Sequence, residues 1–157
     1  MKSIITIGFL AIGIMSANAQ AYKTAVGLRL GTFQGLTVKH NLSEKVALEG
    51  LVFSRWGGFG VTGLFELHND LNAENLKWYY GAGGHVAIFS TNNISNAWVS
   101  NNTGSATIIG VDGILGLEYT LEGIPLNLSI DIKPIFNIIG SQGLYLGDGA
   151  LSVRYAF

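Results

Sequence analysis

Charged and apolar residues alternate along most of this chain, and this alternation limits the possible folds more than any other feature. In the stretch Leu144–Phe157, Leu151 and Val153 alternate with Ser152 and Arg154. Side chains on a β-strand point alternately to opposite faces, so such a segment has one apolar and one polar face. Similar stretches recur along the chain and predict about eight strands, each of roughly the 9–11 residues that a tilted membrane-spanning strand requires.

The expected strands are 22–31, 36–42, 46–56, 61–68, 77–90, 108–121, 126–137 and 144–157. Short turns rich in Gly, Asn or Pro separate most of them. The longest stretch outside the strands is 91–107, which is rich in Asn, Ser and Thr and carries no charge. Pairing of the first strand with the last would remove both open edges of the sheet.

Within these strands, every charged residue falls on the face opposite to the apolar residues, a relation called parity below. In lipid, an outward Arg or Lys near the bilayer midplane costs about 2–4 kcal/mol, so a membrane barrel keeps its charges inside. The sequence therefore predicts an all-β, eight-stranded antiparallel up-and-down transmembrane β-barrel. The interior of eight strands is just wide enough for side chains, so we expect a filled lumen crossed by ion pairs with a structural role. The expected lumen network is Arg29, Lys39, Glu49, Arg55, Glu66, His85, Asp112, Glu118, Asp131, Lys133, Asp148 and Arg154.

Aromatic residues of outward parity form two groups. Two girdles of this kind are typical of the two interfaces of a membrane barrel. The alternative, core aromatics of a soluble β-sandwich, stays open at this point. The group near the chain termini is Trp78, Tyr80, Tyr119, Tyr155 and Phe157, and the group near the other end is Trp56, Phe136 and Tyr145.

The N-terminus has the three parts of a secretory signal. Lys2 is followed by the apolar run Ile4–Met15 and by the small-residue site Ala17–Ala19. This order predicts a signal peptide over 1–19 and leaves 20–157 as a single barrel domain. After residue 19 no apolar run reaches the 18 residues of a helical span. The absence of cysteine excludes a disulfide framework, and the net charge of −1 offers no basic field for nucleic acid.

Strand number predicts the orientation of the barrel. An even number of strands brings both termini to one side, which in an exported chain is the periplasm. The turns near Ser43, Asn69 and Glu122 are then periplasmic, and 91–107 is the long extracellular loop. That loop is the place where we expect any extracellular ligand to bind.

Four motifs carry a resemblance to known proteins: Lys77–His85, Gly110–Gly113, Ile124–Ser129 and Leu151–Phe157. The chain resembles the small outer-membrane β-barrel proteins of Gram-negative bacteria, the short, signal-bearing, OmpA- or OmpX-like eight-stranded kind. The resemblance implies an outer-membrane location, contact with outer-membrane lipid, and folding by the barrel-assembly machinery. It also implies that Val153, Tyr155 and Phe157 form the assembly signal. No catalytic, cofactor or metal residues are expected.

Two other functions remain as alternatives. Some small barrels that resemble this one modify lipid A, and His40 with Ser43 and Glu44 is a local candidate for such an enzyme. The expected topology puts these residues in the periplasmic leaflet, while His68 is periplasmic and His85 lies near the middle. The other alternative is a small porin-like channel, although 138 mature residues supply too few strands for a wide pore.

Overall fold

The computed structural model describes residues 22–55, 57–90, 104–140 and 143–157. The expected signal peptide, Trp56 and residues 91–103 of the long loop lie outside these ranges. Within them no helix is long and apolar enough to cross a membrane, and all regular structure is β. The strands are β1 Thr24–Gly31, β2 Gln34–Ser43, β3 Val46–Arg55, β4 Gly58–Asp70, β5 Leu76–Ser90, β6 Ser105–Thr120, β7 Leu126–Ile132, β8 Ile135–Ile139, β9 Gly143–Tyr145 and β10 Gly149–Ala156.

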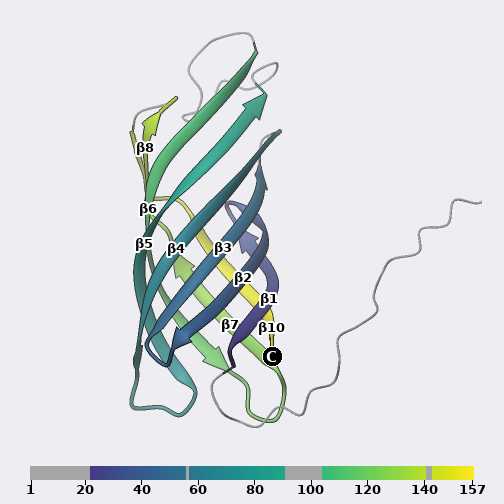
Figure 1. Ribbon diagram of the computed structural model, residues 1–157, viewed down its shortest axis with the longest axis vertical. Coiled ribbons are helices and arrows are strands. Elements are labelled where there is room, and N and C mark those ends of the chain that lie inside the picture. Colours follow the sequence, from purple (N-terminus) through teal and green to yellow (C-terminus); the bar gives the residue numbers. More distant parts are fainter. Residues whose placement is uncertain (1–21, 56, 91–103, 141–142) are drawn as a thin grey trace, which may run out of the picture.

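These strands form one closed antiparallel barrel (Figure 1). Each strand from β1 to β6 pairs with the next, and β7 joins β6 to β10. The ring closes where β1 pairs with β10, with Val26 opposite Tyr155 and Leu30 opposite Leu151. The expected pairing of the first and last strands is therefore confirmed.

Two of the eight barrel strands are interrupted, which accounts for the ten segments. β7 and β8 are separated by Lys133 and Pro134, and β9 and β10 by residues 146–148. Proline has no N–H to give to a ladder, but its carbonyl still accepts a hydrogen bond from Gly113 N at 2.8 Å. Across the gap, Lys133 N donates to Asp148 O at 2.7 Å. The two interruptions thus lie side by side in the wall.

The interruption before β10 corrects one sequence-based expectation. Leu146 and Gly147 are both exposed, so the alternation shifts by one residue there. Tyr145 consequently packs inward against Phe33, with ring centroids 6.2 Å apart, and does not join an outer girdle. A second correction concerns the long loop, because Ser105–Thr107 already belong to β6.

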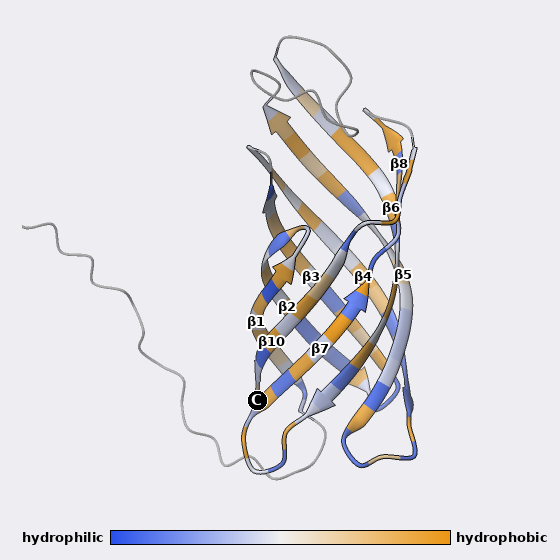
Figure 2. Cartoon of the chain, turned by 180° about the vertical axis from the view of Figure 1, so that it is seen from behind, coloured by the Kyte–Doolittle hydropathy of each residue, from blue (hydrophilic) through white to orange (hydrophobic). Residues whose placement is uncertain are grey.

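Apolar and polar residues alternate along the strands (Figure 2), and the apolar ones are exposed on the outer face of the barrel. Large exposed apolar side chains come from all ten strand segments, from Leu28 on β1 to Val153 on β10. Charged side chains near the middle of the strands are buried instead, so the polarity of a soluble protein is reversed. The aromatic group near the chain termini lies on this outer face, where Trp78 stacks on Tyr80 with ring centroids 5.3 Å apart and the rings of Tyr155 and Phe157 are 6.2 Å apart.

Exposed charges gather at the end of the barrel drawn at the bottom of Figure 1, called the lower end below. Lys77 Nζ lies 3.6 Å from Asp70 and donates to Glu44 O at 3.3 Å. Asn75 donates to Glu122 at 2.9 Å and so joins the β4–β5 turn to the β6–β7 turn. Phe157 lies at this end too and exchanges backbone hydrogen bonds with Thr24.

Candidate functional site in the barrel lumen

The structure places all twelve residues of the expected lumen network on the inner side of the wall. Eleven of them are buried, and Arg55 is only partly buried. Arg55 donates to Thr32 O and lies over the ring of Phe33, with its Cζ 5.5 Å from the centroid. The other members form two clusters, one in the lower half of the lumen and one above it.

The lower cluster is centred on Lys39, whose side chain is fully buried. Lys39 Nζ lies 2.9 Å from both Glu66 Oε2 and Glu118 Oε2, and 3.6 Å from Glu49 Oε2. These carboxylates belong to β4, β6 and β3, while Lys39 belongs to β2. One ammonium group therefore links four strands across the lumen.

Arg154 completes the lower cluster from β10. Its guanidinium pairs with Glu49 and donates to Ser129 Oγ at 2.7 Å and Asn127 Oδ1 at 3.2 Å. Its Nε donates to Thr37 Oγ1 at 3.0 Å. Since the donors of an arginine lie in one plane, this set of acceptors fixes the orientation of the side chain.

His68 and Tyr79 belong to the lower cluster, although the expected network omits both. His68 Nε2 lies 3.7 Å from Glu66 Oε2 and 3.8 Å from Glu118 Oε2. The Tyr79 ring stacks on His68 at 5.1 Å and also lies 4.1 Å from Lys39 Nζ. The inward parity of both residues is visible in the sequence, since His68 follows Glu66 by two positions and Tyr79 precedes His85 by six.

The upper cluster joins β1, β5, β6, β7 and the two interruptions. Arg29 lies 2.6 Å from Asp131 and 3.1 Å from Asp148. Lys133 lies 3.2 Å from Asp148 and 3.8 Å from Asp112. His85 Nδ1 lies 3.0 Å from Asp112 Oδ1, and Tyr79 OH donates to Asp131 at 3.3 Å.

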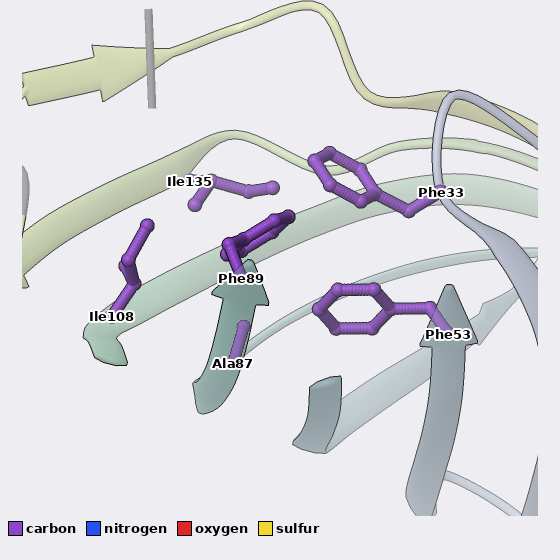
Figure 3. Close-up of a cluster of buried hydrophobic side chains, with 6 residues drawn as sticks. All are labelled: Phe33, Phe53, Ala87, Phe89, Ile108 and Ile135. Carbon is purple, nitrogen blue, oxygen red and sulfur yellow. The ribbon is translucent and has the colours of Figure 1, made fainter. Parts of the chain in front are cut away.

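An apolar plug, absent from the sequence-based prediction, closes the lumen above these charges. Figure 3 shows its members converging from β3, β5, β6, β8 and the turn between β1 and β2, and Phe33 packs edge-on against Phe53 with centroids 5.2 Å apart. The gap lined by Arg29, Phe33, Phe53 and Lys133 does not hold a water-sized sphere. The plug consists of Phe33, Phe53, Ala87, Phe89, Ile108 and Ile135.

Other candidate chemistry is not brought together in the described part of the chain. His40 Nδ1 lies 2.9 Å from Thr24 Oγ1, whereas Ser43 Oγ accepts from Lys45 N at 3.4 Å. No group of three or more His, Asp or Glu side chains is arranged to hold a metal ion within residues 22–55, 57–90, 104–140 and 143–157.

A hollow lies on the outer face of the barrel. It has a volume of about 660 Å³ and crosses β1, β10, β7, β6 and β5. Leu30, Leu117, Ile130 and Leu151 line it, and Gly149 leaves room for it by lacking a side chain. Its walls are almost entirely apolar.

No protein-family model matches this chain, and no curated protein matches it. The geometry of the barrel and its lumen therefore carries the functional assignment.

Proposed function

We propose that this chain is an integral β-barrel protein of a bacterial outer membrane, with a filled lumen and a structural or surface-interaction role. The observation that carries the proposal is the reversed polarity of the barrel. Side chains such as Leu28, Ile130 and Phe136 are 48–59% exposed, while Lys39, Glu66 and Arg154 are fully buried.

Water is a poor solvent for this outer surface. Soluble monomers rarely expose a contiguous apolar patch larger than a few hundred Å², yet here the apolar band runs over every strand. A bilayer offers the matching solvent, since a membrane barrel presents an apolar band about 25 Å tall. The shorter strands β1, β2, β3 and β10 have 8–10 residues, which at a rise of about 3.3 Å each and a tilt of about 40° cover roughly 20–25 Å.

The closed sheet supports the same reading. Every backbone group in the hydrocarbon core must find its partner within the protein, and closure leaves no edge strand in lipid. The pairing of β1 with β10 supplies that closure. At the interrupted positions the backbone bonds from Gly113 to Pro134 and from Lys133 to Asp148 serve the same purpose.

A filled interior favours a structural role over transport. The ion pairs of the two clusters and the apolar plug occupy the lumen from its lower to its upper part. The local candidates for a lipid-modifying enzyme do not come together, since His40 Nδ1 lies beside Thr24 Oγ1 while Ser43 Oγ accepts from Lys45 N. The hollow around Gly149 has the size and apolar lining suited to a lipid acyl chain.

Orientation and assembly are part of the proposal. The lower end, with its exposed charges and aromatic residues, would face the periplasm, and residues 91–104 would face outward, where they could meet an extracellular ligand. The outward row of Val153, Tyr155 and Phe157 would be read by the barrel-assembly machinery. Residues 1–19 would direct export.

Heat-modifiable migration tests the proposal. The protein is expressed in a Gram-negative host, and its membrane and soluble fractions are compared by gel electrophoresis with and without boiling. We expect it in the outer-membrane fraction, with a folded form that migrates differently until it is boiled. Recovery as a folded protein in the soluble fraction would overturn the proposal.

A further inference from the structure

The hollow on the outer face of the barrel is a groove between two rows of side chains. The lower row crosses five neighbouring strands, because the strand registers place each of its members opposite the next. Its members are Trp78 on β5, Leu117 on β6, Ile130 on β7, Leu151 on β10 and Leu30 on β1. The upper row crosses β6, β7 and β10 with Leu115, Ile132 and Gly149.

The floor of the groove lies between the two rows. Gly116 on β6 and Ala150 on β10 both pair with Asp131 on β7. These residues have inward parity, so they present their backbone to the groove. Asp131, the one ionisable residue among the described residues of the lining, is 3% exposed and lies 2.6 Å from Arg29 inside the lumen. The groove therefore presents no charge to an occupant.

Gly149 leaves the upper side of the groove open. It is the first residue of β10 after the interruption at 146–148. A Cβ at this position would meet Asp131 O at 3.8 Å, an ordinary contact, so a larger side chain has room there. A glycine within a strand has no side chain to pack and often marks a place where a ligand approaches closely.

The groove climbs from the lower end of the barrel toward its middle. Trp78 follows Leu76, the first residue of β5, by two positions, whereas Leu30 follows Thr24, the first residue of β1, by six. From β5 to β1 the strand spacings of about 4.8 Å add up to a length of roughly 19 Å. On strands tilted by about 40°, a row of this length climbs roughly 12 Å, half the height of an apolar band about 25 Å tall.

We propose that this groove binds one acyl chain of a phospholipid from the leaflet at the lower end of the barrel. The inference rests on the membrane location proposed above and adds a defined lipid site to it. One acyl chain spans one leaflet, which is half of a hydrocarbon core about 30 Å thick, so its reach matches the climb of the groove. It is uncharged and narrow enough to lie between rows of side chains about 7 Å apart along each strand.

Trp78 sets the direction in which the chain lies. It belongs both to the lining of the groove and to the aromatic group near the chain termini, where its ring stacks on Tyr80 with centroids 5.3 Å apart. Tryptophan and tyrosine are enriched at the level of the lipid headgroups. The headgroup therefore lies beside Trp78, and the acyl chain ends near Gly149 and Leu30.

Photolabelling in a bilayer tests the proposal. The purified barrel is reconstituted into phosphatidylcholine vesicles that contain a phospholipid with a diazirine in the middle of one acyl chain. After illumination, mass spectrometry locates the label along the chain. We expect several-fold more label around Leu117, Ile130 and Leu151 than around Leu48 on β3 and Phe65 on β4. The comparison is fair because all five side chains are 44–59% exposed on the outer face.

Two glycine variants identify the groove as the cause of the excess. Gly149→Leu puts a side chain into the groove, so the label on β6, β7 and β10 should fall to the level of β3 and β4. Gly63→Leu is the matched control, since Gly63 is also exposed on the outer face and a Cβ there meets nothing within 4 Å. This variant should keep the wild-type pattern. An excess that survives in Gly149→Leu, or that is lost equally in both variants, would overturn the site.

The wild-type barrel alone can also overturn the proposal. Equal labelling of all strands would refute the site and leave the membrane location intact, because lipid would then contact the whole outer face alike. Weaker labelling of β6, β7 and β10 than of β3 and β4 would refute it too, since a second copy of the protein would then cover the groove. A barrel with no label on any strand would contradict the membrane location itself, and the lipid site with it.

Discussion

Arg29 and Asp131 form an ion pair across the strand that closes the barrel. Arg29 Nη2 on β1 lies 2.6 Å from Asp131 Oδ1 on β7, and β10 lies between these two strands in the sheet. The pair therefore ties together two strands that share no backbone hydrogen bonds. It reinforces the seam at which the first and last strands meet.

Breaking this pair should destabilise the barrel strongly. Removing one partner of a buried ion pair leaves the other charge uncompensated and typically costs about 3–5 kcal/mol. We expect this loss for Asp131→Asn and for Arg29→Gln in urea unfolding. The double variant should be less destabilised than the sum of the two, because neither charge is left alone. Strictly additive losses would show that the two side chains do not interact.

Gly116 is predicted to be intolerant of any side chain. A Cβ there would lie 2.6 Å from Tyr79 Cζ and 2.7 Å from Ile130 O, and the Tyr79 ring contacts both His68 and Lys39 Nζ. Gly116→Ala should cost about 1–3 kcal/mol of unfolding free energy, as overpacking does elsewhere. Gly63→Ala is the matched control, since a Cβ there meets nothing within 4 Å. Equal stability of the two variants would contradict the tight packing of Tyr79.

Much of the fold could be predicted from parity alone. A period of two assigns each side chain to a face, and this assignment holds for Lys39, Glu66 and Arg154, because the alternation is unbroken in the segment around each of them. Parity fails at Tyr145, since the interruption at 146–148 shifts the alternation. Pro134 indicates from the sequence that the strand is interrupted between β7 and β8. It does not indicate which backbone groups form hydrogen bonds across that interruption.

The candidate site was harder to predict than the wall. Parity places Arg29 and Asp131 inside without saying that they meet, because partners across a lumen depend on strand tilt and stagger. Phe33 lies in the turn between β1 and β2, where side chains do not alternate between two faces. It is nevertheless 2% exposed and belongs to the apolar plug. The apolar plug in the upper part of the lumen was not predicted from the sequence.

The filled lumen predicts the absence of conductance. The apolar plug and both charge clusters lie in series along the barrel, so opening one layer leaves the next in place. The purified protein should give no large stable current steps in planar bilayers, and Phe33→Ala should give none either. Regular steps from the monomeric wild-type protein would favour the channel alternative.

Cysteine labelling should report the proposed orientation. The chain has no native cysteine, and Ser105 and Glu122 are exposed at opposite ends of the barrel. In intact cells, a membrane-impermeant maleimide should label Ser105→Cys. Glu122→Cys should react only after the outer membrane is permeabilised. The reverse pattern would mean that the lower end faces outward, and labelling of both in intact cells would argue against insertion.

An outward charge should distinguish a membrane barrel from a soluble one. Leu28 lies in the middle of β1 and is 53% exposed on the outer face. In a bilayer, Leu28→Arg should lower the unfolding free energy by about 2–4 kcal/mol, because the charge must leave water at mid-depth. On a water-exposed surface the same change is usually within about 0.5 kcal/mol.

Leu71→Arg is the control, since Leu71 is exposed in the turn between β4 and β5 at the lower end, where the charge stays in water. Unfolding of both variants from lipid vesicles gives the comparison. A loss at Leu28 no larger than that at Leu71 would mean that the outer face of β1 does not meet hydrocarbon.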